Sequence, residues 1–289
     1  LAGRLHTPDR LLLRVVQGPA RSYEQLAALV PSSTELQVVV SHVNPNRIAL
    51  LHELARRWDK LRLVASNPGA KLLQDLWAQR KPTPAGEAEG PALPPLPPLT
   101  VVRGEDSIER PDGYTINLLS APTPRWPGAL MAFEETTGLL MSGKFFSAHL
   151  CSQDWAEANR SSTEEDRRYF YDCLMAPMAR QVEAVLNRLD ELSIRCIAPG
   201  HGPAIAESWR SLLVDYRRWG ESQERSSLSV ALLFASAYGN TAAIADALAQ
   251  GVSRTGVRVE SVNCEFTPAE KLLETIRSCN ALLIGSPTL

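Results

Sequence analysis

The sequence predicts two α/β domains in tandem, a sandwich-type domain followed by a doubly wound parallel sheet. Short strand-like runs with amphipathic helices between them fill the first two hundred residues, which is typical of a layered α/β domain. From residue 228 onward, apolar strand runs and helical patterns alternate in the order β–α–β–α–β, and that order predicts a parallel sheet. The polar stretch 220–227 separates the two patterns and reads as a linker, so we place the domains at 1–222 and 228–289.

The first region provides the elements of the layered domain. Strands are expected at 11–16, 36–40, 61–66, 100–102, 115–119, 130–133, 139–142 and 195–198. Helices are expected at 23–29, 48–58, 71–79, 164–191 and 208–219. The proline-rich run 81–98 lacks the N–H groups that a ladder needs, so we expect a surface insertion there, with a PxxP recognition segment as the less favoured alternative.

The last sixty residues supply the parallel sheet. Strands are expected at 228–235, 257–262 and 281–284, with a helix at 241–254 between the first two. A second helix is expected to begin after Thr267 as N-cap, with Pro268 in the first position and Glu270 in the third. Each strand is then joined to the next by a helix.

Composition excludes several classes of protein. Thirty basic and 32 acidic side chains give a net charge of −2, so neither nucleic acid nor an anionic membrane is expected as a partner. The five cysteines are scattered and lack C-x-x-C spacing, which favours a reducing compartment over a disulfide scaffold. No apolar run approaches the about 20 residues that cross a bilayer, so no membrane span is expected.

Two loops follow strands that we expect to be neighbours in the sheet. The predicted cofactor-binding residues are Ser236, Ala237, Tyr238, Gly239, Asn240 and Thr241 in the first loop, and Ser286, Pro287 and Thr288 in the second. Hydroxyls and backbone N–H groups of a tight turn at a helix N-terminus bind anions, and ligands of such sheets lie beyond the carboxyl ends of the strands. Gly239 supplies the φ freedom that the turn needs. The first loop resembles the one with which a flavodoxin holds the phosphate of FMN.

The resemblance to a flavodoxin covers only part of that domain. Three strands are present, whereas a flavodoxin has five, and the missing part would carry the loop that covers one face of the flavin ring. The sequence also begins at Leu1 without a methionine. We therefore expect the chain to be a fragment of a longer protein.

Four earlier segments resemble one family. Ser41-His42 after a strand resembles the first metal loop of the metallo-β-lactamase fold. The segments 122–127 (PTPRWP), 143–151 (GKFFSAHLC) and 198–202 (APGHG) resemble the P-x-x-H-W-P, N-D-A-F-G-x-H-x-C and last histidine segments of flavodiiron proteins. A flavodoxin-like domain after such a domain is the flavodiiron arrangement, and the later motifs are most similar to members from oxygenic phototrophs. The resemblance implies a metallo-β-lactamase-like αββα sandwich followed by a truncated flavodoxin-like sheet.

The departures from the family lie at the metal-ligand positions. The family's H-x-E-x-D-H is replaced by a segment with no carboxylate, and two further ligands become basic. The degenerate positions are His42, Asn44, Asn46, Arg47, Arg125, Lys144 and His201. Only the two histidines match the family's ligands.

The charges at these metal-ligand positions decide what a pocket formed by them can hold. Three carboxylates of the family are offset by two iron ions, whereas this chain places Arg47, Arg125 and Lys144 in the same pocket. Protonated guanidinium and ammonium groups have no lone pair for a metal, and two histidines cannot satisfy two iron ions. We therefore expect no diiron centre. Such cations need compensation, so we expect a bound anion or acidic partners such as Asp154 or Glu135.

The resemblance implies an electron-transfer subunit. It would bind FMN through 236–241 and 286–288 and pass electrons towards the reduction of oxygen to water. Family members pair head to tail, so a homodimer or a heterodimer with a metal-competent paralogue is implied. Reduced pyridine nucleotide or ferredoxin would be the electron source, and a second flavin and NAD(P)H would be used only if a C-terminal reductase domain exists. The expected location is the cytoplasm, or the plastid stroma in a eukaryotic phototroph.

Two alternatives belong to other classes. The chain could be a non-catalytic scaffold or regulatory subunit that keeps the dimer interface and binds an anion where the metal would lie. Hydrolysis of the metallo-β-lactamase type is the third reading, and it needs a metal-bound water that the missing ligands disfavour. Flavin separates the first two readings, because only the electron-transfer subunit requires it.

Overall fold

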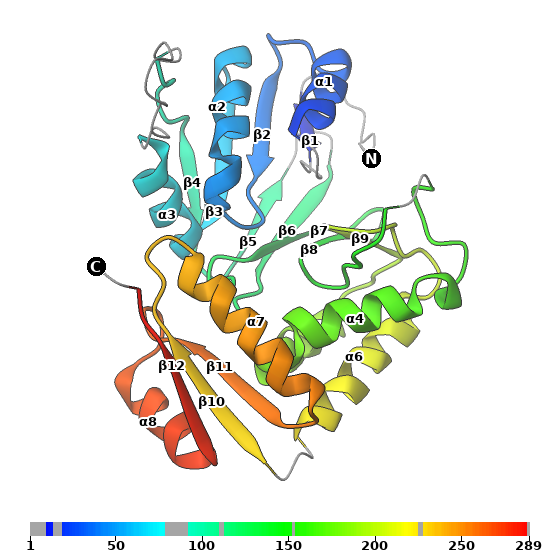
Figure 1. Ribbon diagram of the computed structural model, residues 1–289. Helices are drawn as coiled ribbons and strands as arrows, with labels where there is room; N and C mark the ends of the chain where they lie inside the picture. Colours follow the sequence, from blue (N-terminus) through cyan, green and yellow to red (C-terminus); the bar gives the residue numbers. More distant parts are fainter. Residues whose placement is uncertain are drawn as a thin grey trace. The chain divides into compact units, whose positions relative to one another are not determined.

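A computed structural model describes residues 10–13, 19–78, 92–109, 113–151, 154–224 and 228–287 (Figure 1). The chain forms two compact units, one of Leu1–Ser120 with Gly128–Glu134 and one of Ala121–Pro127 with Glu135–Leu289. The domain boundary that the sequence predicts between residues 222 and 228 stays a prediction. Most of the proline-rich run lies outside the described residues.

The first unit contains a parallel sheet with the strand order β1-β2-β3-β4. Its strands are β1 (Arg10–Leu13), β2 (Glu35–Val39), β3 (Leu61–Ser66) and β4 (Leu99–Val102). Its helices are α1 (Pro19–Leu29), α2 (Ile48–Arg57) and α3 (Asn67–Trp77). Leu36, Leu63 and Leu73 are fully buried in the core between sheet and helices. Helical crossovers make the parallel pairing possible because parallel neighbours cannot be joined by a hairpin.

The same unit contains an antiparallel ladder with one strand that the sequence analysis missed. The ladder consists of β5 (Glu105–Glu109), β6 (Thr115–Ser120) and β7 (Leu130–Glu134). β5 has three acidic residues and is largely exposed, so it carries neither β-propensity nor an apolar alternation. Pairing with β6, and not local preference, forms this strand.

In the second unit, β8 (Leu139–Gly143) pairs in parallel with β9 (Cys196–Pro199). The helix predicted over 164–191 is wrong, because the structure divides it into α4 (Glu164–Leu174) and α5 (Ala179–Leu189). The short 3₁₀ turn η3 (Ala176–Met178) separates them, and Pro177 in that turn lacks the N–H that a continuous helix requires. Helix α6 (Trp209–Glu224) runs into the stretch predicted as a linker, so only its end can serve as one.

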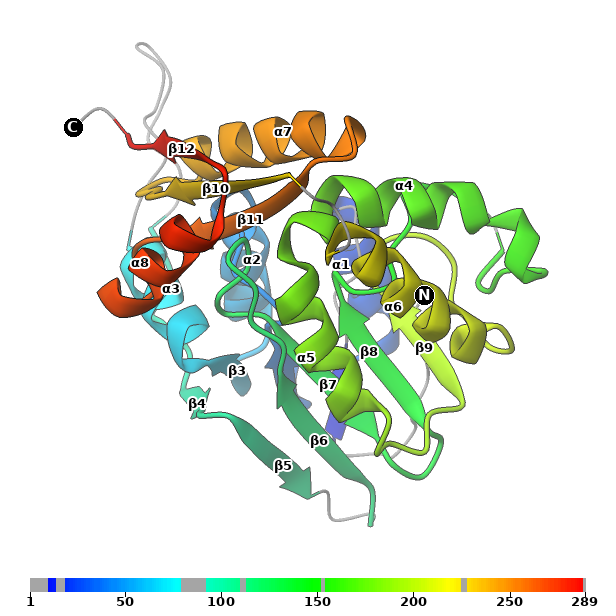
Figure 2. The same cartoon turned by 90° about the horizontal axis from the view of Figure 1, so that it is seen from below.

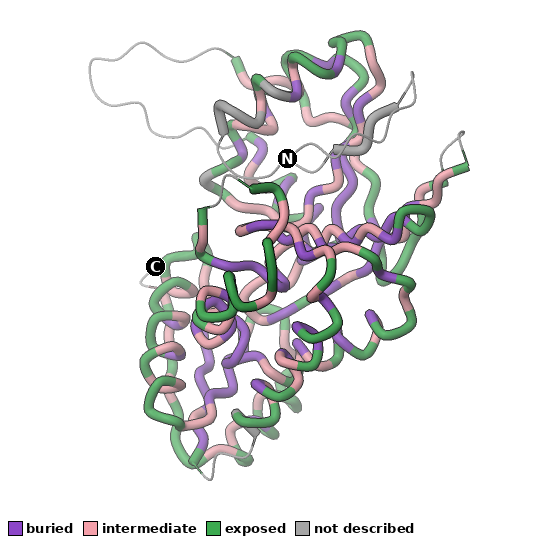
Figure 3. Tube along the Cα trace, turned by 90° about the vertical axis from the view of Figure 1, so that its right-hand side faces the viewer, coloured by how far each residue is buried: buried purple, intermediate pink, exposed green. Residues whose placement is uncertain are grey.

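The end of the second unit is a three-stranded parallel sheet with the order β11-β10-β12. Its elements are β10 (Ser229–Phe234), α7 (Asn240–Arg254), β11 (Arg258–Asn263), α8 (Ala269–Ser278) and β12 (Ala281–Gly285). Helices α7 and α8 cover opposite faces of this sheet (Figure 2). β10 and β11 are almost entirely buried, whereas α8 and β12 are mostly exposed, and the tube coloured by burial shows the same contrast between strands and outer helices (Figure 3).

The start of α8 differs from the prediction. The N-cap is Pro268, and the hydroxyl of Thr267 instead donates to the carbonyl of Asn263 at 2.8 Å. The preceding turn therefore uses the side chain that the sequence analysis assigned to the helix. The helix still begins within two residues of the predicted position.

Candidate functional site

The first predicted loop is a tight turn that leads into a helix. Gly239 has φ +86° and precedes α7, a conformation that other residues adopt only with strain. The hydroxyl of Ser236 accepts a hydrogen bond from the N–H of Ala242 at 3.0 Å and so fixes the first turn of the helix. Tyr238 is 78% exposed, which leaves its ring available to a ligand. We name residues 236–241 the phosphate-type loop.

The second predicted loop lies beside the first. β12 pairs with β10 in parallel, and the N–H of Ala235 donates to the carbonyl of Gly285 at 3.0 Å. A Cβ at Gly285 would lie 3.2 Å from the Thr241 methyl, so the end of β12 meets the start of α7 closely. Ser286 and Pro287 follow at once, and Thr288 lies outside the described residues.

The position of the two loops follows from the strand order. The chain leaves the central strand β10 to form β11 on one side and β12 on the other. This reversal is a topological switch point, where open parallel sheets bind their ligands. The pairing of β10 with β12 therefore brings both predicted loops to the same edge of the sheet.

A carboxylate that the analysis did not assign contacts the phosphate-type loop. The N–H of Ser236 donates to Oε2 of Glu265 at 3.1 Å, and the backbone N–H of Glu265 donates to the Asn263 side chain at 3.0 Å. Glu265 thus engages one of the N–H groups of the loop.

Three of the seven degenerate positions gather in the second unit. Nζ of Lys144 lies 2.8 Å from Nε2 of His201. The guanidinium carbon of Arg125 and Nζ of Lys144 lie 5.1 and 5.8 Å from the centre of the Trp126 ring, which attracts both cations. We name Arg125, Trp126, Lys144 and His201 the basic cluster.

Arg125 has an acidic partner inside the same unit. It forms an ion pair with Asp246 of α7, a residue that the sequence analysis did not name, and the two side chains are 25% and 16% exposed. Burial lowers the pKa of Arg125 to about 10. The guanidinium therefore remains a cation at neutral pH.

His149 borders the basic cluster. Its ring centre lies 6.4 Å from that of His201 and 4.8 Å from that of Phe170. Burial lowers the pKa of His149, and the positive charges of Lys144 and Arg125 lower it further. This imidazole is consequently biased towards its neutral form.

One buried arginine ties together the two loops that carry Lys144 and His201. Arg167 is completely buried, pairs with Glu157 at 2.9 Å and donates to the carbonyls of Phe146 and Pro203. Phe146 has φ +61°, and its N–H donates to the hydroxyl of Tyr216 at 3.0 Å. Neither the arginine nor the left-handed turn has a signal in the sequence.

The other four degenerate positions lie in the first unit. His42 and Asn44 are half-buried in the loop after β2, and Asn46 belongs to the 3₁₀ turn η1 (Pro45–Arg47). Arg47 is exposed at the start of α2. The contacts described above therefore join three of the seven positions.

The donor atoms do not fit a resident metal. Within the described ranges, no group of three or more histidine, cysteine, aspartate or glutamate side chains could hold a metal ion. A lysine ammonium has donors only, so its contact with Nε2 of His201 occupies the lone pair that a metal would need.

Among the helices that the structure describes, none is long and apolar enough to cross a membrane.

Similar proteins agree with this architecture. No family model matches the chain. It is 40% identical to diflavin flavoprotein A 4 of Synechocystis, over 87% of this chain and 40% of that protein. It is 39% identical to diflavin flavoprotein A 6 of Nostoc, over 87% of this chain and 42% of that protein. The metal-soaked Flv1 flavodiiron core from Synechocystis aligns with a TM-score of 0.86 and 33% identity, over 97% of this chain and 66% of that one. The chain belongs to the flavodiiron family.

Membership of the flavodiiron family confirms the predicted fold class. Rubredoxin oxygen:oxidoreductase from Desulfovibrio gigas, at 17% identity and a TM-score of 0.60, shares the fold over 97% of this chain and 67% of that one. The flavodiiron architecture is a metallo-β-lactamase-like domain followed by a flavodoxin-like domain, as the motif order predicts. The chain spans about two fifths of the length of the curated relatives that it matches.

Proposed function

We propose that the chain is an FMN-dependent electron-transfer subunit of the flavodiiron type that lacks a diiron centre of its own. Electrons would pass towards oxygen reduction to water through a metal-competent partner subunit in a head-to-tail dimer. Reduced pyridine nucleotide or ferredoxin is the proposed source. The proposal is supported by the contrast between the left-handed turn at the start of α7 and the basic cluster, whose two cations offer no lone pair to a metal.

The phosphate-type loop fits the flavin phosphate. Gly239, Asn240 and Thr241 form the start of α7, where free N–H groups and the helix dipole attract a phosphate. Ser286 and Pro287 border the same edge of the sheet. A bound flavin supplies hydride and one-electron chemistry. Residues 236–241 would hold its phosphate.

The basic cluster does not fit the iron ions of the family. Lys144 takes the Nε2 of His201, and Arg125 offers no lone pair. Two like charges around one indole ring also oppose a divalent cation. No catalytic step is therefore assigned to this cluster, and oxygen chemistry is assigned to the partner.

A scaffold with an anion-binding pocket is the second candidate. Lys144 and Arg125 both lie near His149, so positive charge is concentrated there. Asp246, however, already supplies a carboxylate to Arg125 and removes one reason for a bound anion. Electron transfer remains the function that both sites support together.

Elemental analysis and flavin titration test this proposal. The protein is expressed in iron-replete medium and purified without chelators, and iron, zinc and flavin are measured per chain. We expect near-zero metal and quenching of FMN fluorescence on titration of the protein. About two irons per chain would contradict the metal-free assignment, and metal-free protein with no affinity for FMN would favour the scaffold.

A further inference from the structure

Helix α7 has a polar stripe beside its apolar face. Ala245 and Ala249 are each 1% exposed and pack in the core of the three-stranded sheet. Asp246, Gln250 and Arg254 are spaced four residues apart, so they line one side of the helix next to that face. The helix therefore presents small apolar residues to the sheet and three hydrogen-bonding side chains to another surface.

Each residue of the polar stripe contacts a partner in the second unit. Asp246 forms the ion pair with Arg125. Gln250 donates to Sγ of Cys173 at 2.7 Å. Arg254 donates to the hydroxyl of Tyr169 at 3.3 Å, and its guanidinium lies 5.6 Å from the centre of that ring. Helix α4 supplies two of the three partners, and the segment Ala121–Pro127 supplies the third.

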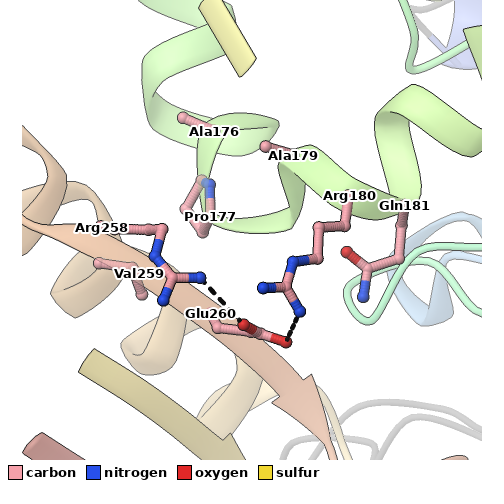
Figure 4. A pocket seen from close by; sticks show the side chains of 8 residues that line it. All are labelled: Ala176, Pro177, Ala179, Arg180, Gln181, Arg258, Val259 and Glu260. Atoms are coloured by element: carbon pink, nitrogen blue, oxygen red, sulfur yellow. Dashed lines mark hydrogen bonds and ion pairs between the residues drawn. The ribbon is translucent and has the colours of Figure 1, made fainter. Parts of the chain in front are cut away.

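A second polar contact joins β11 to helix α5 of this unit. Glu260 of β11 receives Arg180 of α5 at 3.3 Å and Arg258 at 3.4 Å, at a shallow pocket beside η3 (Figure 4). The hydroxyl of Thr275 lies 3.4 Å from the same carboxylate. Polar contacts from both α7 and β11 therefore join the three-stranded sheet and its helix to the rest of the second unit.

The ion pair of Arg125 is the most consequential of these contacts. Both members of the pair are largely buried, whereas Arg180 is 57% exposed and its pairing with Glu260 is weakened by solvent. Removing one member of a buried pair leaves the other charge without compensation, which is more costly than losing an exposed pair. The guanidinium also lies 5.1 Å from the centre of the Trp126 ring, which attracts it.

We propose that Arg125 is a positioning residue for the flavodoxin-like part of the chain. Its ion pair with Asp246 sets the place of α7, the helix that begins at the phosphate-type loop, against the segment Ala121–Pro127 of the same unit. At a position where the family carries a metal ligand, the side chain serves as a tether. This role does not depend on whether FMN binds.

Amide hydrogen exchange in the whole chain, without FMN, tests the tether. Peptides that cover 240–254 are followed in the wild type, in Arg125→Ala, in Asp246→Ala and in the exchanged pair Arg125→Asp with Asp246→Arg. We expect each single change to speed exchange of α7 about tenfold, because local opening becomes easier, and the exchanged pair to recover most of the protection.

Arg62→Ala provides a matched control. Arg62 forms an ion pair with Glu35 at 3.2 Å in the first unit, so its loss should leave exchange of α7 unchanged. If Arg125→Ala does not fold, Asp246→Asn removes the same attraction with little change in shape. Unchanged amide exchange of α7 in the single variants would overturn the proposal. It would also be overturned if the single variants exchange faster and the double variant, in which the two charges are swapped, does not restore the protection. Failure of the wild-type chain to bind FMN would count against the proposed flavin site and not against the tether, because the exchange is measured without FMN.

Discussion

At the scale of single residues, the turn that carries Lys144 depends on a buried phenol. The hydroxyl of Tyr216 accepts the hydrogen bond of the Phe146 N–H, and φ of Phe146 is +61°. A left-handed residue that is not glycine costs about 1–2 kcal/mol, so its surroundings must hold it in place. Burial raises the pKa of Tyr216 above its ordinary value, so the phenol stays neutral.

Tyr216→Phe should therefore destabilise the protein. The N–H of Phe146 would be left buried without an acceptor, which costs about 1–3 kcal/mol of the free energy of unfolding. Urea denaturation measures the change. Tyr171→Phe is the matched control, because the ring of Tyr171 lies 4.9 Å from that of Tyr216 and its buried hydroxyl has no partner among the described residues. Equal losses in the two variants would contradict the assigned role of the hydrogen bond.

At the scale of elements, the start of α7 depends on one glycine. Gly239 has φ +86° and a Cβ there would meet no atom within 4 Å, so backbone strain alone would penalise a substitution. Gly239→Ala should lower the affinity for FMN about five- to thirtyfold, as strain of about 1–2 kcal/mol distorts the phosphate-type loop. Fluorescence titration measures the affinity.

Gly251 offers the control within the same helix. It has ordinary helical φ, and a Cβ there would also meet nothing within 4 Å. Gly251→Ala should keep the affinity for FMN and raise the melting temperature slightly, because alanine favours helix by about 1 kcal/mol. A weaker affinity in this variant, or an unchanged one in Gly239→Ala, would refute the requirement for a left-handed residue.

Element types were predictable where periodicity was strong, and contacts between distant segments were not. The β–α–β–α–β order of the last sixty residues is confirmed, because each apolar run ends at a clear turn signal. β5 was missed because its acidic residues have low strand propensity, and the helix over 164–191 was drawn through Pro177. Asp246 could not be foreseen as the partner of Arg125, since the pairing joins segments 121 positions apart.

At the scale of the whole molecule, two histidines with lowered pKa values, the buried His52 and the exposed His149, couple stability to pH. Burial lowers the pKa of His52 in the first unit and of His149 in the second below the ordinary value of 6.5. Below that value the unfolded chain binds more protons than the folded one. The stabilisation present above about pH 6.5 is therefore lost as the pH falls through the pKa values of the folded protein.

Replacing His52 by glutamine should reduce this dependence. His52 lies 3.1 Å from the carbonyl of Trp77, and an amide can keep that hydrogen bond without taking up a proton. Urea midpoints at pH 7.5 and 5.5 should differ less for His52→Gln than for the wild type. Identical differences in the two proteins would show that this imidazole does not contribute to the coupling.

The tether of Arg125 also bears on whether a metal site could be built here. A change of Arg125 to histidine, the residue that the family's motif has at this position, would leave Asp246 with its charge partly buried and unmatched, before any metal affinity could be gained. Lys144 would still occupy the imidazole of His201, so that first step would bring a loss without a benefit. The two basic residues therefore reinforce each other, because replacing either one alone removes a contact without completing a set of metal ligands.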